Sequence, residues 1–510
     1  MNLSKQNTTN ITLTKNNIEV NLLSGNHVID FFLNPKTVAV IGASKNKTKG
    51  GYRIINNLLT NNYKGKIYPV NPNSDGEVFG LEFNKSILEI EDDIDLAIFY
   101  SPSSVVPDIL KECIKKNVKG ALIETAGFEE VGGIGLELKD EILKVTDNFS
   151  KIRVVGPNCM GLTKIDGDSD SEERGGFFSG FGVFDNYRRG NIAIISQSGM
   201  LNGGYLRNLM RNYPDLGIRY SCSIGNKMDL SEIEFLEYCL DDPTVNVIAL
   251  YLESFKDPRK FIELCNKTRK IPNKTIILLK GGSTSLGQKA SLSHTGSLAE
   301  NSQLINAIIK QSKIIQAGNL HDLFQFARTF SMIYKTGKKL PILGNISMMA
   351  GSGGAGTISA DLTMKHGLNF PIMEEKTYQV LKDLYPEWMP PNRFALLDLW
   401  PTFEKAMMNN VSQKDVMTKI WKAVLDDTNI EGVFNMMFVS SRFSNRYDIK
   451  EMINYATDKI VFMWVVGDNR KALRMTNLFN KNNILTFPTM EEMIKNFSML
   501  VQEAKNKIIG

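Results

Sequence analysis

Short apolar runs recur along this chain of 510 residues, and segments long enough to form a helix separate them. The runs are rich in β-branched residues and lack the polar alternation of half-exposed strands. Such runs are typical of parallel strands that are buried on both faces of a sheet. In the first third of the chain they lie at 37–41, 67–70, 96–100, 121–123 and 153–155. They predict a doubly wound α/β domain.

The same pattern occurs twice more. The second series lies at 192–195, 218–222, 247–252, 276–279 and 314–316, and the third at 346–350, 433–439, 460–466 and 484–487. Because a domain takes about 150 residues, a chain of this length is also expected to hold three domains, or four small ones. We predict a polar N-terminal extension over 1–29, α/β domains over 30–165, 191–337 and 338–510, and a linker loop over 166–190.

Composition and charge exclude several classes of protein. Hydrophobic residues make up 42% of the chain and charged residues 23%, as in soluble globular proteins. The formal net charge of +5 is spread along the chain, which is too weak a bias for a dedicated nucleic-acid binder. No apolar stretch reaches about 18 residues and the N-terminus is polar, so we expect a cytoplasmic protein that does not enter a membrane. The five cysteines form no C-x-x-C pair, which favours free thiols over a disulfide framework or a metal site.

The first domain has a turn of small residues, Gly42, Ala43 and Ser44, between its first strand and a helical pattern. Such a turn lets backbone N–H groups and a helix N-terminus approach phosphate oxygens. The spacing departs from G-x-G-x-x-G, so a tight turn that merely needs small residues is the alternative. Asn71 and Pro72 follow the second strand, where doubly wound folds contact ribose or adenine.

The second domain carries a stronger group of residues. Ser198 and Gly199 follow a strand and open a helical pattern, which makes a second potential anion site. Glu253 follows another predicted strand, and His294 lies in a small polar loop at 291–297. A lone histidine in such a loop is most often simply solvated. However, a neutral imidazole can attack phosphorus, and a carboxylate such as Glu253 on its second ring nitrogen would fix the tautomer and support the charged product.

The third domain contains a glycine-rich loop at 351–357, which includes Gly354, Ala355 and Gly356 and precedes a helical pattern. It is another potential anion cradle. It lacks a Gly-Lys-Ser/Thr ending, which excludes a Walker-type P-loop. A close strand-to-helix crossover is the alternative, and the presence of three such loops in one chain weakens it.

Residues 293–299, Ser-His-Thr-Gly-Ser-Leu-Ala, resemble the phosphohistidine segment of the NDP-forming acyl-CoA synthetases, which are relatives of succinyl-CoA synthetase. Further segments are similar to landmarks of that family, in the same order: 38–44, 68–72, 156–161, 196–199, 224–229, 251–253 and 279–282. The resemblance extends from about residue 30 to the C-terminus. It implies a Rossmann-like CoA-binding domain followed by two flavodoxin-like ligase domains.

The resemblance also implies roles for single residues. His294 would be phosphorylated in turn by acyl phosphate and by NTP, and Glu253 would orient it. The reaction implied is acyl-CoA + NDP + phosphate ⇌ carboxylic acid + CoA + NTP. The residues placed near CoA are Gly42, Ala43 and Ser44 at its phosphates, Asn71 and Pro72 at its nucleotide end, and Asn158 and Cys159 at its thiol end. Those placed around the transferred phosphate are Ser198, Gly199, Gly354, Ala355 and Gly356.

Two departures from the family bear on function. Asn73 stands where family members commonly have a lysine, so contacts to the CoA phosphates are expected from Lys47 or Lys49. No segment resembles the ATP-grasp domain that binds nucleotide and Mg²⁺. We therefore expect an α-type subunit in a hetero-oligomer, whose ATP-grasp β subunit supplies the site for ATP or ADP and Mg²⁺.

Two rival functions remain from the sequence. One is a noncatalytic CoA-binding or regulatory protein of the same superfamily, and the presence of His294 with Glu253 argues against it. The other is an NAD-dependent dehydrogenase. It would need an acidic residue after the second strand to bind a ribose, and Asn71 stands there instead.

Overall fold

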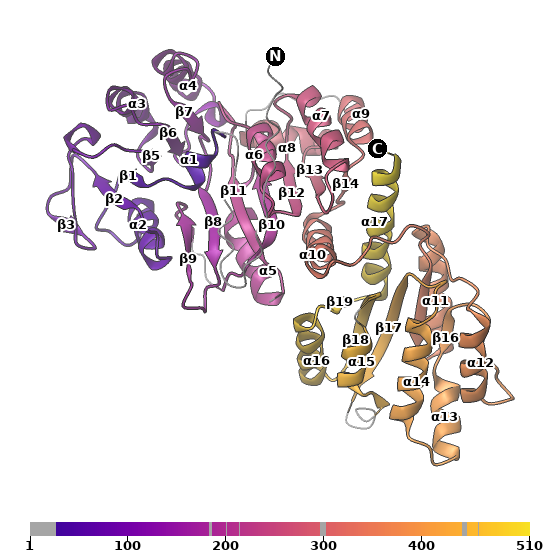
Figure 1. Cartoon of the computed structure of the whole chain (residues 1–510). Helices are drawn as coiled ribbons and strands as arrows, with labels where there is room; N and C mark the ends of the chain where they lie inside the picture. The colour runs from indigo at the N-terminus through magenta and orange to yellow at the C-terminus, as the bar shows by residue number, and fades with distance from the viewer. Residues whose placement is uncertain are drawn as a thin grey trace, which may run out of the picture.

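The computed structural model of the chain describes residues 27–182, 186–199, 201–213, 215–295, 302–440, 446–456 and 458–509. Three sheets follow one another along the chain, and each contains five parallel strands (Figure 1). In each sheet the first parallel strand lies between the second and the third, so the order is 2-1-3-4-5. This is the order of a doubly wound fold, and it confirms the predicted class of three serial α/β units.

The first unit places its strands in the order β2 (Lys66–Val70), β1 (Thr37–Ile41), β5 (Leu96–Phe99), β6 (Gly120–Ile123) and β7 (Arg153–Val155). Its helices are α1 (Asp30–Leu33), α2 (Gly50–Thr60), α3 (Val106–Lys115) and α4 (Ile134–Thr146). β3 (Glu77–Val78) and β4 (Leu81–Glu82) form a separate hairpin. Every residue of β5 and β6 is buried, which explains why these runs show no polar alternation.

The second unit has the strand order β14 (Ile315–Gln316), β13 (Thr275–Lys280), β12 (Val247–Leu252), β10 (Arg189–Ser196), β11 (Ile218–Ser223), β8 (Leu162–Gly167) and β9 (Gly175–Phe178). Its helices are α5 (Leu206–Asn212), α6 (Glu232–Asp241), α7 (Pro258–Arg269), α8 (Ser285–Thr295), α9 (Ser302–Ser312) and α10 (Leu320–Thr336).

The stretch 166–190, predicted as a linker loop, contains a strand. β9 pairs antiparallel with β8, and β8 pairs antiparallel with β11, so both strands extend the second sheet at its edge. Gly175 and Gly176 hide β9 from the sequence pattern, because they carry no side chain that could show an alternation. The first unit therefore leads directly into the sheet of the second.

The third unit has the strand order β16 (Leu396–Asp398), β15 (Ile346–Ala350), β17 (Gly432–Val439), β18 (Ile460–Gly467) and β19 (Leu485–Thr486). Its helices are α11 (Gly353–Lys365), α12 (Glu375–Leu384), α13 (Trp400–Met408), α14 (Gln413–Leu425), α15 (Ile449–Tyr455), α16 (Asn469–Lys481) and α17 (Met490–Ile509). Nowhere in the described part of the chain is a helix long and apolar enough to cross a membrane.

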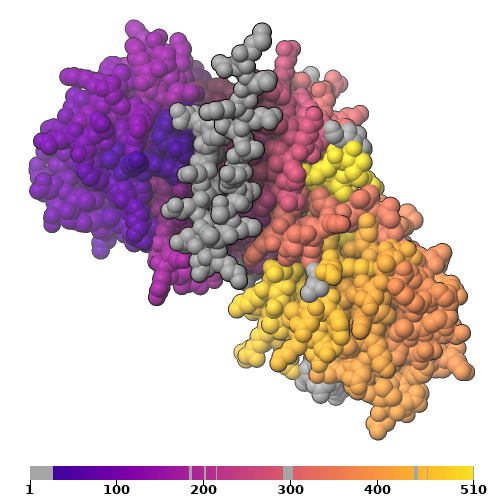
Figure 2. Space-filling model, in the orientation of Figure 1, coloured from indigo at the N-terminus to yellow at the C-terminus, as the bar shows by residue number. Residues whose placement is uncertain are grey.

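Two elements join the third unit to the second. The helix α17 extends back along α10, and Lys507 Nζ donates a hydrogen bond to the Lys274 carbonyl at 2.8 Å. In the other direction, the buried Arg328 of α10 donates to the Thr486 carbonyl of β19 at 3.0 Å. Figure 2 shows the third unit, orange to yellow, projecting from the rest of the molecule. The third unit is therefore joined to the second through α10 and α17, and one buried apolar core extends across both units.

Candidate functional site

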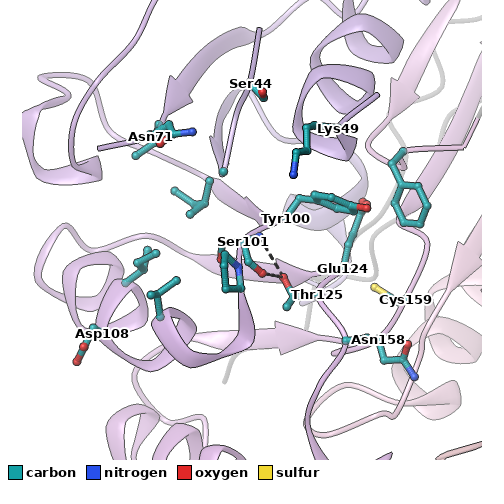
Figure 3. A pocket seen from close by; sticks show the side chains of 18 of the residues that line it. Ser44, Lys49, Asn71, Tyr100, Ser101, Asp108, Glu124, Thr125, Asn158 and Cys159 are labelled. Atoms are coloured by element: carbon teal, nitrogen blue, oxygen red, sulfur yellow. Dashed lines mark hydrogen bonds between the residues drawn. The ribbon is translucent and has the colours of Figure 1, made fainter. Parts of the chain in front are cut away.

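One large cavity lies at the carboxyl ends of the strands of the first sheet, where the strand order reverses around β1. Its volume is about 1020 Å³, and a doubly wound sheet binds its ligand at this position. Figure 3 shows side chains from the ends of several strands directed into this space. Most candidate residues of the first two units line it: Gly42, Ser44, Asn71, Pro72, Asn158, Cys159, Ser198 and Gly199.

Close packing explains the small residues after β1. Gly42 has φ of +82°, and a side chain there would overlap the carbonyl group of Tyr100. Gly51, in the first turn of α2, is held in the same way against the carbonyl of Gly42. Ala43 is fully buried, whereas Ser44 lines the cavity. The packing brings the N-terminus of α2 directly beside the end of β1.

The N-terminus of α2 brings positive charge to the cavity. Lys49 is the N-cap residue, and it makes no side-chain cap, so its side chain does not occupy the first N–H groups of the helix. This side chain is exposed and lines the cavity. Lys47, the other candidate from the sequence, is not among the lining residues. The helix dipole and the Lys49 ammonium group together favour an anionic ligand here.

The turn after β2 forms the next part of the wall. Asn71 Nδ2 donates a hydrogen bond to the Ala43 carbonyl at 2.7 Å, which fixes this turn to the turn after β1. Lys85 also lines the cavity, and its Nζ donates to the Pro72 carbonyl at 3.3 Å. The same ammonium group pairs with the Asp75 carboxylate at 2.5 Å, so Lys85 brings an ion pair to the wall beside Asn73. No motif in the sequence indicates this position, because Lys85 comes from the segment after β4.

Asn158 and Cys159 lie at the other end of the cavity from Asn71 (Figure 3). Asn158 adopts a φ of +58° and donates its backbone N–H to the Thr125 carbonyl at 2.9 Å. Cys159 Sγ lies 3.4 Å from the Ile123 carbonyl, and burial raises the pKa of the thiol well above its ordinary value. Cys159 is therefore a neutral packing group rather than a nucleophile.

Gln197 connects the candidate residues of the second unit. Its Oε1 accepts a hydrogen bond from the backbone N–H of Glu253 at 2.6 Å, and its side chain lines the cavity together with Ser198 and Gly199. Tyr251 Oη donates to the Glu253 carboxylate at 3.2 Å. Burial raises the pKa of Tyr251 to about 12, so its hydroxyl stays protonated as a donor. The turn that carries Glu253 is thus fixed to the turn that closes the cavity.

The backbone of His294 lies in α8, which corrects the expectation of a loop at 291–297. The helix continues to Thr295 because Gln288, Lys289 and Ala290 are good helix formers. The side chain of His294 and residues 296–301 lie outside the described residues. The helix α8 contacts η3 (Glu129–Val131), which follows β6 of the first unit. The segment that carries His294 is therefore next to the first unit.

No described residue of the third unit lines the cavity. Gly354, Ala355 and Gly356 form the first turn of α11, and Ser352 Oγ caps this helix by accepting from the Ala355 N–H at 3.2 Å. Gly354 is exposed, and a side chain added there would meet open space. Figure 1 shows α11 in the C-terminal lobe, away from β10, which Ser198 follows. The two loops predicted to surround one phosphate are therefore separate in this structure.

Glu124 is a further residue of the site, and sequence reasoning missed it. It follows β6 and lines the cavity, although only 4% of its surface is exposed. Tyr100 and Phe181 line the same cavity, and their ring centroids lie 5.2 Å apart. In sequence Glu124 looks like an ordinary acidic residue at the end of a strand, because its burial depends on the neighbouring unit.

Two segments of the chain match known domain families. Residues 36–164 match the CoA binding domain, and residues 189–330 match the succinyl-CoA ligase like flavodoxin domain. These segments include every described residue that lines the cavity except Phe181.

Curated relatives extend the likeness to the third unit. The ADP-forming acetate–CoA ligase I subunit alpha of Pyrococcus furiosus is 30% identical over 495 residues, which cover 94% of this chain and 98% of that protein. The ADP-forming acetate–CoA ligase II of Archaeoglobus fulgidus is 30% identical over 88% of this chain, and that of Methanocaldococcus jannaschii is 40% identical over 69%. The chain spans 65% and 46% of the lengths of these two relatives.

A solved structure is similar over nearly the whole chain. It is Ca. Korarchaeum cryptofilum dinucleotide forming Acetyl-coenzyme A synthetase 1 in complex with phosphate and ADP, with a TM-score of 0.78 and 28% identity. The likeness covers 94% of this chain and 97% of that one.

Proposed function

The chain belongs to the family of the ADP-forming acyl-CoA synthetases, in the succinyl-CoA synthetase superfamily, and from this premise we propose that it is the CoA-binding, phosphohistidine-bearing α-type subunit of such an enzyme. The reaction is acyl-CoA + ADP + phosphate ⇌ carboxylic acid + CoA + ATP, through an acyl phosphate and a phosphohistidine. The observation that carries this proposal is the single cavity lined by Gly42, Asn158 and Ser198, since it joins the predicted CoA site to the second unit.

CoA lies in this cavity with its nucleotide end at Asn71 and its thiol end at Cys159. The pyrophosphate faces the N-terminus of α2, where Lys49 supplies a countercharge. Lys85 stands beside the turn at Pro72, where it is paired with Asp75, and adds a hydrogen-bond donor at the nucleotide end. This orientation brings the thiol to the end of the cavity that Ser198 closes, where it faces the second unit.

His294 receives the phosphoryl group from the acyl phosphate and passes it to ADP. Glu253 acts as a positioning residue, because a carboxylate that accepts from the second ring nitrogen stabilises the cationic ring. The Ser198 N–H donates to Ser196 Oγ at 3.0 Å, so the Gly199 N–H and the Ser198 hydroxyl are the groups that meet the phosphoryl oxygens. Glu253→Gln should therefore slow phosphorylation of His294 by about 10- to 100-fold without unfolding the chain, because an amide does not carry the compensating charge.

A separate ATP-grasp β subunit binds ADP or ATP with Mg²⁺. Support comes from the α subunit of Pyrococcus furiosus, which this chain covers over 98% of its length. Gly354 and its neighbours in α11 then face this partner rather than the CoA cavity, since they are exposed on the projecting third unit. The three domains span about 30–165, 191–337 and 338–510, and β8 and β9 connect the first two by extending the second sheet. The relatives are named as ligases, so a noncatalytic regulatory role is not favoured.

Calorimetry with CoA tests the binding part of the proposal. The wild-type chain should bind CoA, and Lys49→Gln should weaken binding about tenfold, because a hydrogen bond to a charged group contributes about 1.5 kcal/mol. Lys47→Gln is the matched control, since Lys47 belongs to the same loop but does not line the cavity. Equal losses in the two variants, or no CoA binding by the wild-type chain, would remove the assignment.

Turnover assays test whether the reaction needs a second polypeptide. The tagged chain is purified from its native cells with its partner, and the partner is then stripped away. ATP formation from acetyl-CoA, ADP and phosphate should require both polypeptides. Full turnover by the chain alone would overturn the split-enzyme proposal, and CoA binding without turnover by the complex would overturn the ligase proposal.

A further inference from the structure

Glu124 is a residue of the cavity lining whose two carboxyl oxygens are buried. It is 4% exposed, and no described residue donates a hydrogen bond to either of its oxygens. One side of the carboxyl group is packed against Gly161, since a Cβ added there would lie 2.6 Å from Oε1. A buried polar group without a partner costs about 1–3 kcal/mol, so its retention points to a ligand that satisfies it.

The position of Glu124 identifies the part of the ligand that it meets. Figure 3 shows Glu124 and Cys159 at one end of the cavity, with Asn71 at the other. Gln197 and Ser198 of the second unit line the cavity as well, so this end is enclosed by two units. Because CoA is proposed to place its thiol here, the acyl group that forms the thioester must lie beside Glu124.

The surroundings keep the carboxyl group protonated. Burial raises the pKa of Glu124 well above its ordinary value. The backbone N–H of Phe181 acts in the opposite direction, although it forms no hydrogen bond with either carboxyl oxygen. The other titratable groups that line the same cavity are Cys159, whose own pKa Glu124 raises further, and Tyr100, Lys49, Lys85, Asp108 and Glu112. A neutral carboxyl group is a hydrogen-bond donor, which an ionised one is not.

We propose that Glu124 donates a hydrogen bond to the acyl carbonyl oxygen of the thioester and of the acyl phosphate, and that it is a catalytic residue for the exchange between them. This inference rests on the proposed function. It assigns to a side chain of the first unit the stabilisation of charge on the carbonyl oxygen, at the point where acyl transfer needs it most.

The exchange balances without a proton from Glu124. When acyl-CoA forms, the sulfur of CoA bonds to the acyl carbon of the acyl phosphate, and the carbonyl π electrons move onto the oxygen. The hydrogen bond from Glu124 stabilises that charge. The electron pair then returns as the C–O bond to phosphate breaks, and phosphate leaves with the bonding pair and with the thiol proton. Glu124 keeps its own proton throughout.

Two variants in the full chain, assembled with its nucleotide-binding partner, test this inference. Acetyl-CoA formation is measured from acetate, ATP and CoA over a range of pH. Glu124→Leu should lower kcat about 100-fold or more, as does the loss of one oxyanion donor, and should leave the CoA affinity unchanged by calorimetry. Glu124→Gln should keep a kcat close to the wild-type value, because an amide also donates. It should also lose the fall in rate that ionisation of Glu124 causes at alkaline pH.

Glu141→Gln is the matched control, since Glu141 is an exposed carboxylate of α4 in the same unit. A Gln variant as slow as the Leu variant would overturn the inference and indicate a proton acceptor instead. A Leu variant as fast as the wild type would also overturn it. If Glu124→Leu fails to fold, the inference is tested by the pH profile of Glu124→Gln, and a fall in rate at alkaline pH that matches the wild type would overturn it. If the wild-type complex binds CoA but makes no acetyl-CoA, the proposed function fails first, and this inference fails with it.

Discussion

Two strand-to-helix turns of this molecule look alike in sequence and differ in structure. The turn at Gly42 has glycine because Tyr100 leaves no room for a side chain, and the helix that follows has no side-chain cap. The turn at Gly354 has open space around it, and Ser352 caps its own helix. The first turn is built into a cavity, whereas the second is presented to the outside. Gly42 thus allows close packing inside the first unit, whereas Gly354 lies on the exposed surface of the third.

The largest effect is expected at Gly42. Gly42→Ala places a Cβ on the Tyr100 carbonyl at a φ of +82°, and should lower the free energy of unfolding by about 3 kcal/mol, with loss of most CoA affinity. Urea unfolding followed by circular dichroism measures the first quantity and calorimetry the second. A Gly42→Ala variant as stable as the wild type would show that packing against Tyr100 does not require glycine at this turn.

CoA binding should affect the turn at Gly42 and leave the turn at Gly354 unchanged. At 100 times its dissociation constant, CoA should stabilise the chain by about 2.7 kcal/mol through mass action. Amide exchange should slow in α2 and near Ser198, and should stay unchanged in α11. Mass spectrometry of exchanged peptides resolves these segments. Equal protection of α11 would show that the third unit belongs to the CoA site.

A smaller effect is expected at Ser352. Ser352→Ala removes the oxygen that accepts from the Ala355 N–H, and should destabilise α11 by about 1 kcal/mol. The CoA affinity should not change, because this residue does not line the cavity. Urea unfolding with calorimetry on the same sample checks both. A drop in CoA affinity at unchanged stability would contradict the separation of the two turns.

The smallest effect on stability is expected at Gly354. Gly354→Ala adds a methyl group in open space within a helix, so it should be neutral or stabilise the chain by about 0.5 kcal/mol. Any loss of turnover should then appear only in the complex with the partner, as a change in assembly. A loss of CoA binding by the isolated variant would be inconsistent with an outward-facing turn.

The sequence predicts the fold well where strands are central and parallel. β1 and β12 occupy the residues of their predicted runs, because all but one residue of each strand is buried and buried positions favour apolar side chains. β16 and β9 lack this signal. β16 has only three residues, and β9 begins with two glycines at the edge of a sheet. The pattern therefore misses β9 and β16, although it finds β14 and β19, which are edge strands of two residues each.

The site is predicted in part, and the reason is geometric. Parallel strands gather their carboxyl ends at one edge, so the turns at Gly42, Asn71 and Asn158 could be expected to meet. Lys85 and Glu124 could not be found in this way. Lys85 reaches the cavity from a loop outside the strand-end pattern, and the burial of Glu124 depends on contacts between distant segments.

The central claim is that a phosphoryl group passes through His294 of this chain. The complex is incubated with acetyl-CoA and radiolabelled phosphate, and the labelled chain is mapped by peptide mass spectrometry. We expect label at His294 of the wild-type chain that is lost in acid and kept in base, and we expect no label on His294→Ala. Label that survives acid, or that persists in His294→Ala, would contradict it.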